Sequence, residues 1–374
     1  MRKDLKRRAI CTIIANNYIA FARTLVASVL AAHPDCTCYV LIVDEFEGLI
    51  DPAAEKFEIV TMPELGISDL SSFCFKYDVT ELSTAAKPYL LEFLLAQRGL
   101  DQLLYIDPDI LVTNPLDRLF QRLETYDIVL TPHLDTDYPD DGLLPNDAFI
   151  LKSGVFNLGF IGIRSSPSVR KFLHWWQGKV YDKCVIDHAK GYFVDQRFID
   201  LLPGLFDNYF VEKDTGYNVA YWNLHSRRLE NENDTWTCNG SPLYFYHFSG
   251  YRINQPEAIS SHITRYHLSN RPDIAPLFAE YRERLIKNGY EQSIARPYSH
   301  DYFSNGQRIP KEVRVSYRNS AEESESPGNP FESAALARRA RRLILKSKAL
   351  YALNPLRWRT LVRKRVVGSL RSRK

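Results

Sequence analysis

Residues 103–112 constrain this chain more than any other stretch. An apolar run, Leu-Leu-Tyr-Ile, meets Asp107-Pro108-Asp109 and then resumes as Ile-Leu-Val. A run of this kind predicts a buried strand. Pro108 has no N–H to donate to a neighbouring strand, so the strand is expected to end there. Two carboxylates then stand together at the carboxyl end of a strand, which is where open α/β sheets bind ligands.

Asp107 and Asp109 predict a cation site. Two carboxylates this close repel each other unless a cation lies between them or one of them is protonated. Mg²⁺ is typically held by one or two carboxylates together with substrate phosphates. The alternative is an ordinary strand-ending turn, because Asp and Pro are both common turn residues. The spacing alone leaves both interpretations open.

The order of apolar segments predicts an α/β fold. Strands are expected at residues 9–15, 38–43, 57–60, 103–106, 127–131 and 156–163, with helices at 19–33, 80–95 and 169–176 between them. This alternation is typical of a mostly parallel sheet with helices on both faces. Because parallel strands share a carboxyl edge, residues 15–18 should lie near the Asp-Pro-Asp turn. No apolar stretch reaches the roughly 18 residues that a membrane-spanning helix needs.

Three further segments each allow two interpretations. Residues 133–146 are polar and rich in Pro, Asp and Gly, which fits either a binding loop or a passive surface loop. Asp195 opens a helix, where a carboxylate can serve simply as a capping group. His247 ends a strand beside a glycine turn, so it is either a ligand or a core histidine. Glycines within residues 156–163 indicate a close approach of a ligand or of another backbone segment.

The C-terminal residues differ from the rest of the chain in charge. Residues 337–374 contain fourteen Lys and Arg and no acidic residue; since the whole chain is +3, the first 336 residues carry −11. Residues 319–333 have the composition of a linker. Residues 334–374 predict basic amphipathic helices that bind an anionic membrane surface. The alternatives are a solvated tail or a polyanion-binding tail, but nucleic acid is not expected because stacking aromatics are few.

The order of the motifs resembles that of the GT-A glycosyltransferases. The motifs are Ala15-Asn16-Asn17-Tyr18, Lys87, Tyr-Ile-Asp107-Pro-Asp109, Asn157-Leu-Gly159, Asp195-Gln196 and His247-Phe-Ser-Gly250. They are most similar to the retaining, family-8-like enzymes, such as galactosyltransferases of lipopolysaccharide synthesis and glycogenin. The resemblance covers about residues 9–252. It implies a Rossmann-like GT-A catalytic domain.

The resemblance also implies a role for each motif residue. It assigns Mn²⁺ or Mg²⁺ to Asp107, Asp109 and His247, with the metal bridging the two phosphates of a nucleotide-sugar donor. The other implied roles are nucleoside binding by Ala15, Asn16 and Tyr18, nucleotide contact by Lys87, donor-sugar hydrogen bonds from Asn157 and Asp195, and a place near the anomeric carbon for Gln196. For Lys87, a solvent-exposed lysine at a helix start is the alternative.

Two points concern the mechanism. A nucleophile at the position of Gln196 would suit double displacement, as in retaining glycosidases. An amide is a poor nucleophile, so front-face return of the acceptor is an equal alternative. The family pattern also carries a lysine after His-x-x-Gly. Here that lysine is missing, and Arg252, two residues after Gly250, is the candidate replacement.

We therefore expect a metal-dependent glycosyltransferase that moves a hexose from a UDP-sugar to a glycan or lipid-linked acceptor, with retention, in polysaccharide or lipopolysaccharide biosynthesis. The expected domains are residues 1–265 (catalytic), 266–318 (extension), 319–333 (linker) and 334–374 (membrane-associating tail). The six cysteines form no CxxC pair and indicate a reducing compartment, so we expect a cytoplasmic protein, peripheral at the inner membrane face.

The alternative functions are an NDP-sugar nucleotidyltransferase and a non-catalytic binder of anionic lipid or nucleic acid. The lack of a Gly-rich basic loop after the first strand counts against the nucleotidyltransferase.

Overall fold

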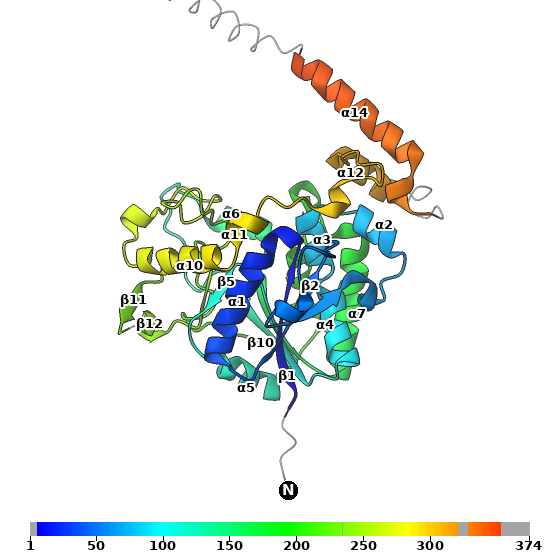
Figure 1. Cartoon of the computed structure of the whole chain (residues 1–374). Helices are drawn as coiled ribbons and strands as arrows, with labels where there is room; N and C mark the ends of the chain where they lie inside the picture. Colours follow the sequence, from blue (N-terminus) through cyan, green and yellow to red (C-terminus); the bar gives the residue numbers. More distant parts are fainter. Residues whose placement is uncertain (1–5, 234, 321–327, 353–374) are drawn as a thin grey trace, which may run out of the picture. The chain divides into compact units, whose positions relative to one another are not determined.

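The computed structural model describes residues 6–233, 235–320 and 328–352, with side chains described as far as Lys346 (Figure 1). Its contacts divide the chain into two compact units. One unit contains residues 1–73 and 77–299, and the other contains residues 74–76 and 300–374. This division falls at residue 299 and not at residue 265 or 318, so the domain boundaries expected from the sequence stay predictions.

Strands and helices alternate through the larger unit. The strands are β1 (Arg8–Ile14), β2 (Thr37–Ile42), β3 (Glu58–Thr61), β4 (Gln102–Ile106), β5 (Ile110–Val112), β6 (Ile128–Pro132), β7 (Phe156–Arg164), β8 (Ile186–Asp187), β9 (Tyr192–Phe193), β10 (Tyr209–Val211), β11 (Leu229–Glu232), β12 (Thr235–Cys238), β13 (Ser241–Pro242) and β14 (Phe245–His247). The α-helices are α1 (Ile19–Ala32), α2 (Leu70–Phe75), α3 (Val79–Ala85), α4 (Lys87–Gln97), α5 (Asp117–Thr125), α6 (Asp147–Ser153), α7 (Pro167–Lys183), α8 (Gln196–Ile199), α9 (Leu202–Leu205), α10 (Ala275–Lys287), α11 (Tyr290–Ser293), α12 (Lys311–Asn319) and α14 (Ala334–Ala352). Short 3-10 helices are η1 (Asn16–Tyr18), η2 (Pro52–Ala54), η3 (Met62–Leu65), η4 (His188–Lys190), η5 (Leu268–Asn270), η6 (Ser299–Asp301) and η7 (Pro330–Glu332).

A seven-stranded sheet forms the centre of the larger unit, in the order β10-β6-β7-β4-β1-β2-β3. Strands β4, β1, β2 and β3 run parallel, as do β6 and β10, while β7 is antiparallel to both of its neighbours. The predicted α/β fold with a mostly parallel sheet is thus confirmed. The antiparallel strand β7 has a consequence for function, because its amino end lies beside the carboxyl end of β4.

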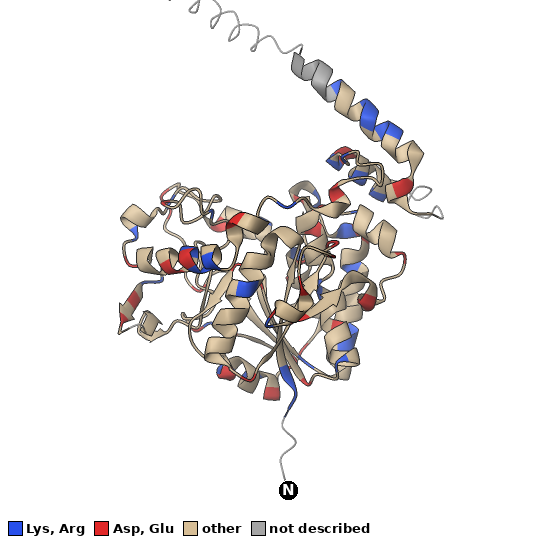
Figure 2. Ribbon diagram, in the orientation of Figure 1, with Lys and Arg blue, Asp and Glu red and all other residues tan. Residues whose placement is uncertain are grey.

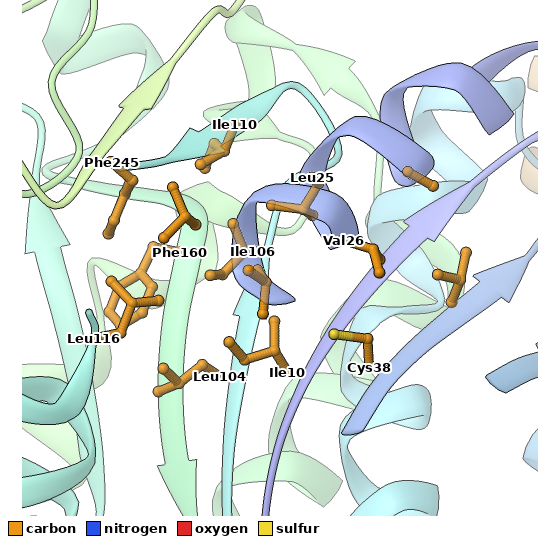
Figure 3. Packing of buried hydrophobic residues seen from close by; sticks show 14 of the residues in the cluster. Ile10, Leu25, Val26, Cys38, Leu104, Ile106, Ile110, Leu116, Phe160 and Phe245 are labelled. Atoms are coloured by element: carbon orange, nitrogen blue, oxygen red, sulfur yellow. The ribbon is translucent and has the colours of Figure 1, made fainter. Parts of the chain in front are cut away.

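Each face of the sheet is covered by helices, as predicted. On one face, Ile10, Leu104 and Phe160 pack with Leu25 and Val26 of α1 and with apolar residues of α5 (Figure 3). On the other face, Lys87 at the start of α4 lies over the ring of Tyr105 in β4, and α4 packs against α7. Burial on both faces explains why β1 and β4 are mostly apolar and do not alternate with polar residues.

Strand β4 ends at Ile106, immediately before the Asp-Pro-Asp turn. The N–H of Ile110 donates to the carbonyl of Asp107 (3.2 Å), which closes the turn. Beyond it, β5 leaves the large sheet and pairs antiparallel with β14, placing Ile110 opposite His247. The turn therefore stands where three strands meet: the carboxyl end of β4, the start of β5 and the end of β14.

The smaller unit has a core of its own. Phe75, Phe303, Val313 of α12, and Leu336 and Ala340 of α14 are all buried in one apolar cluster. The opposite side of α14 carries exposed arginines (Figure 2). The apolar stripe read from the sequence thus covers the unit's own core over the first turns of the helix. Among the described residues, no helix is both long enough and apolar enough to cross a bilayer.

Candidate active site

The main chain fixes the Asp-Pro-Asp turn from two sides. The N–H of Asp107 donates to the carbonyl of Gly159 in β7 (2.8 Å). The N–H of Phe248, just after β14, donates to the carbonyl of Asp109 (2.8 Å). Because both carboxylates sit on backbone that neighbouring strands hold, their positions are set by the sheet and not by a mobile loop.

Asp107, Asp109 and His247 come together as the sequence predicted. The Nε2 atom of His247 lies 3.0 Å from Oδ1 of Asp109 and 3.8 Å from Oδ2 of Asp107. Each residue offers one ligand atom, and the three atoms lie within 4.8 Å of one another. The imidazole is buried, whereas the carboxylates are 28% and 22% exposed and so remain accessible.

The charge of this cluster fits a divalent cation. Burial opposes a charge on His247, but the carboxylate of Asp109 outweighs it and raises the pKa of the imidazole. The cluster therefore attracts positive charge, which a metal would supply. Carboxylates suit Mg²⁺ and Mn²⁺, and an imidazole nitrogen adds a ligand that Mn²⁺ accepts. Asp-Pro-Asp is a turn, as the alternative interpretation had it, but a turn whose two carboxylates face a histidine.

Gly159 makes room for the histidine. A Cβ atom at this position would lie 2.4 Å from Cε1 and 2.7 Å from Nδ1 of His247, and 2.8 Å from Oδ1 of Asn157. These distances are too short for any side chain. A close approach at a glycine of this strand is thus found, but it is made by the side chain of His247 and not by backbone.

Lys87 and Asp195 form a buried ion pair next to the cluster. The Nζ atom of Lys87 lies 2.9 Å from Oδ2 of Asp195 and donates to the carbonyl of Leu158 (2.8 Å). Burial raises the pKa of Asp195, and the lysine opposes this shift. Lys87 is 1% exposed, so the alternative of a solvent-exposed lysine is wrong. Contact of Lys87 with a nucleotide stays a prediction.

Asn157 and Gln196 belong to one set of hydrogen-bonded side chains next to the cluster, called the wall of the site below. The side-chain oxygen Oε1 of Gln196 accepts from the N–H of Leu158 (2.9 Å). Its side-chain nitrogen Nε2 donates to the backbone carbonyl of Ser153 (2.8 Å). Oδ1 of Asn157 accepts from Asn218 (3.0 Å) and from the N–H of Gly159 (3.1 Å). Both amides thus tie strand β7 to its neighbours. Their roles toward a donor sugar stay predictions.

Asn16 and Tyr18, which follow β1 in η1, have different surroundings. The side chain of Asn16 is buried and donates to the carbonyl of Glu45, on the β2 side. Tyr18 is 37% exposed and stacks on Phe21. Burial, followed by the carboxylate of Asp109, raises the pKa of Tyr18 to about 12. Tyr18 therefore lies within electrostatic range of the cluster, and Ala15 is buried at the end of β1.

Sequence reasoning assigned no role to four residues of this wall: Tyr105, His133, Asn218 and Trp222. The hydroxyl of Tyr105 donates to Oδ1 of Asp107 (2.6 Å). The ring of Trp222 packs edge-on against both His133 and His247, with centroids 5.2 and 5.1 Å away. Asn218 has φ of +51°, a left-handed conformation that Asn tolerates better than most residues. Residues 216–223 are rich in aromatic and amide side chains, and this composition could have pointed to Asn218 and Trp222.

His133 supports Asn157 as a neutral base. Burial lowers the pKa of His133 to about 4, so the ring is uncharged at neutral pH. Its Nε2 atom lies 3.2 Å from Nδ2 of Asn157 and can accept a hydrogen bond from that amide. The contact orients Asn157 so that its oxygen faces Asn218 and Gly159.

Ion pairs hold the loop of residues 133–146 in place. Arg227 pairs with Asp135 (2.9 Å), and Arg265 binds Asp141 through two hydrogen bonds (2.5 and 2.8 Å). Both arginines are buried. The hydroxyl of Tyr138 also donates to the carbonyl of Trp222. The loop is thus fixed against the segment that carries Trp222, and it forms part of the wall in this conformation.

Comparison with known proteins places these features in context. No protein family model matches the chain. Two Bacillus subtilis proteins described as uncharacterized are similar: YfnF is 25% identical over 281 residues (74% of this chain, 91% of YfnF), and YfnD is 24% identical over 251 residues (65% and 77%).

Solved structures similar to this chain are glycosyltransferases, the class that the motifs indicated. The galactosyltransferase LgtC, solved with donor and acceptor sugar analogs, is 18% identical with a TM-score of 0.44, over 74% of this chain and 95% of LgtC. The glycosyltransferase GlyE of Streptococcus pneumoniae is 16% identical with a TM-score of 0.42, over 80% of this chain and 67% of GlyE.

Replacing Gly159 with alanine should displace His247 and weaken binding of Mn²⁺, because the added Cβ overlaps the imidazole. Gly162→Ala is a matched control on the same strand, since its Cβ would meet apolar side chains, the nearest at 3.0 Å. Thermal shift with Mn²⁺ and with EDTA measures the effect. We expect Gly159→Ala to lose the metal-dependent shift while Gly162→Ala keeps it. Equal metal-dependent shifts in both variants would contradict this account of Gly159.

Proposed function

We propose that this protein is a metal-dependent glycosyltransferase that uses a nucleotide-sugar donor. The observation that carries the proposal is the cluster of Asp107, Asp109 and His247 at the carboxyl edge of the sheet, with the buried pair of Lys87 and Asp195 beside it. Sheet edges of this type are where α/β folds bind nucleotides. The cluster offers a site for a cation, and the pair offers a carboxylate for a sugar.

A divalent cation held by the cluster would neutralise, as a Lewis acid, the charge that develops on the leaving diphosphate. The protein's own residues supply the remaining functions. We propose that Asp195 and Asn157 form hydrogen bonds with hydroxyl groups of the donor sugar. Tyr18 presents an aromatic face at the rim, where it can stack on a nucleobase. We propose UDP as the nucleotide and a hexose as the sugar.

The hydrogen bonds of Gln196 bear on stereochemistry. Both ends of its amide are engaged by backbone groups, and Asp195 is engaged by Lys87. An amide is a poor nucleophile, and in this arrangement both ends of the Gln196 amide are already hydrogen-bonded. We therefore favour front-face return of the acceptor, with retention, over double displacement. We propose that Gln196 then has a structural role: its hydrogen bonds to Leu158 and Ser153 fix the part of the site beside the donor sugar.

A donor screen by thermal shift tests the proposal. The protein is mixed with UDP, GDP, dTDP or CMP, each with Mn²⁺ and with EDTA. A nucleotide at about 100 times its Kd should stabilise the fold by about 2.7 kcal/mol. We expect UDP to stabilise the wild type only when Mn²⁺ is present, and Asp109→Asn to abolish the effect.

Asp35→Asn serves as the control, because Asp35 is an exposed carboxylate in the turn before β2. It should behave as the wild type does. Shifts that ignore both the metal and Asp109, or no shift with any nucleotide, would refute the proposal.

We further propose that α14 holds the enzyme at an anionic membrane, where a lipid-linked or polysaccharide acceptor would be met. Its described part exposes Arg338, Arg339, Arg341, Arg342 and Lys346. Its residues Leu336 and Ala340 are buried in the core of the smaller unit. Attraction over this part of the helix would therefore be electrostatic, at roughly 1 kcal/mol per cation near the surface. Lys348 also lies in α14, and the basic residues of 353–374 lie outside the described part of the chain.

Vesicle sedimentation tests the membrane proposal. Replacing Arg341 and Arg342 with Gln should weaken binding to phosphatidylglycerol-containing vesicles about 30-fold, because two cations are removed. The same change at Lys171 and Lys183, exposed lysines of α7, should have little effect. Vesicles of phosphatidylcholine alone should not bind. Equal binding to both kinds of vesicle, or binding to DNA in place of anionic vesicles, would contradict the proposal.

A further inference from the structure

The two carboxylate oxygens of Asp107 have different neighbours, Tyr105 and His247. Its hydroxyl donates to Oδ1 at 2.6 Å, while Oδ2 is the oxygen nearer to His247, 3.8 Å from Nε2. The terminal torsion of an aspartate is broad and has no sharp preferred angle. A hydrogen bond to one oxygen therefore decides which oxygen faces the cluster.

Tyr105 is itself held rigidly. Its ring is 3% exposed on the face of the sheet that α4 covers. The ammonium of Lys87 lies 4.4 Å from the ring centroid, a favourable cation–π geometry. The same ammonium is fixed by Asp195 (2.9 Å) and by the carbonyl of Leu158 (2.8 Å). The ring of Tyr105 is thus held by Lys87, which is itself fixed by the carboxylate of Asp195 and the carbonyl of Leu158.

We infer that Tyr105 is a positioning residue that orients Asp107 for metal binding and links it, through Lys87, to Asp195. The inference rests on the proposed function, since it assigns Asp107 to a metal. It adds a residue that binds neither metal nor sugar directly. The chain of contacts runs from the Asp195 carboxylate to the Lys87 ammonium, to the Tyr105 ring, and from the Tyr105 hydroxyl to the Asp107 carboxylate.

The chemistry of a phenol suits this role. A phenol hydroxyl can donate a hydrogen bond to a carboxylate oxygen, and the 2.6 Å from the Tyr105 hydroxyl to Oδ1 of Asp107 fits such a bond. A carboxylate that accepts one hydrogen bond keeps its second oxygen for a cation. Outer groups of this kind usually change metal affinity or activity by 10- to 100-fold when they are removed.

The test compares Tyr105→Phe with Tyr77→Phe. Tyr77 is also fully buried, and its hydroxyl donates to the carbonyl of Val180 (2.6 Å), away from the cluster. Each variant loses one buried hydroxyl and should lose similar stability toward urea. The readout is the Kd of Mn²⁺, measured from the electron paramagnetic resonance signal of free Mn²⁺ without any donor.

We expect Tyr105→Phe to weaken Mn²⁺ binding about 10-fold or more and Tyr77→Phe to leave it unchanged. Placing 4-aminophenylalanine at position 105, which restores an N–H donor, should recover most of the affinity. Unchanged affinity in Tyr105→Phe would overturn the inference, and so would an equal loss in both variants.

The wild type and Asp109→Asn separate this inference from the proposed function. If the wild type binds Mn²⁺ and Asp109→Asn does not, the metal site stands, and the result for Tyr105→Phe decides the inference alone. If the wild type binds no Mn²⁺, the proposed function fails and the inference fails with it. A Tyr105→Phe protein that does not fold while Tyr77→Phe does would assign Tyr105 a structural role and also overturn the inference.

Discussion

Repulsion between two carboxylates held by backbone is the interaction on which this site depends. Hydrogen bonds from Asp107 to Gly159 and from Phe248 to Asp109 fix the turn in place. The chain cannot relieve the repulsion by moving the turn without breaking strand pairing on both sides. Opposite charge must come from outside the turn, and His247, whose pKa is lowered by burial but raised overall by the carboxylates of Asp109 and Asp107, can supply at most one positive charge. A divalent cation would offer more charge in the same volume, which supports the proposal that this turn is part of a binding site.

The antiparallel direction of β7 brings the rest of the site to this turn. Its amino end carries Asn157 and Gly159 to the carboxyl end of β4, where parallel strands place their loops. Gly159 admits the ring of His247, and the carbonyl of Leu158 receives Lys87. One reversed strand therefore connects the cation cluster with the buried ion pair. The same strand explains why Gln196 is engaged at both ends, since it bridges β7 and the end of α6.

The sequence predicted the strands well where apolar runs were long, as in β1, β4 and β7, because burial on both faces leaves a continuous apolar signal. It also brought Asp107, Asp109 and His247 together, through the order of motifs. It could not pair Lys87 with Asp195, since that contact depends on how α4 packs over β4 and β7. His133 and Trp222 went unassigned because their neighbours are distant in sequence. In α14, the apolar stripe was seen correctly, but the core that covers it is built from residues such as Phe75 and Phe303, which no local pattern connects with the helix.

The central claim is that Asp107, Asp109 and His247 jointly bind a divalent metal that contacts a nucleotide. Anomalous diffraction at the manganese edge, from crystals grown with UDP and Mn²⁺, tests it most directly. We expect an anomalous peak about 2.0 to 2.6 Å from a ligand atom of each of the three residues, adjacent to diphosphate density. Diphosphate density without manganese at this cluster, or manganese bound elsewhere with the nucleotide, would contradict the account.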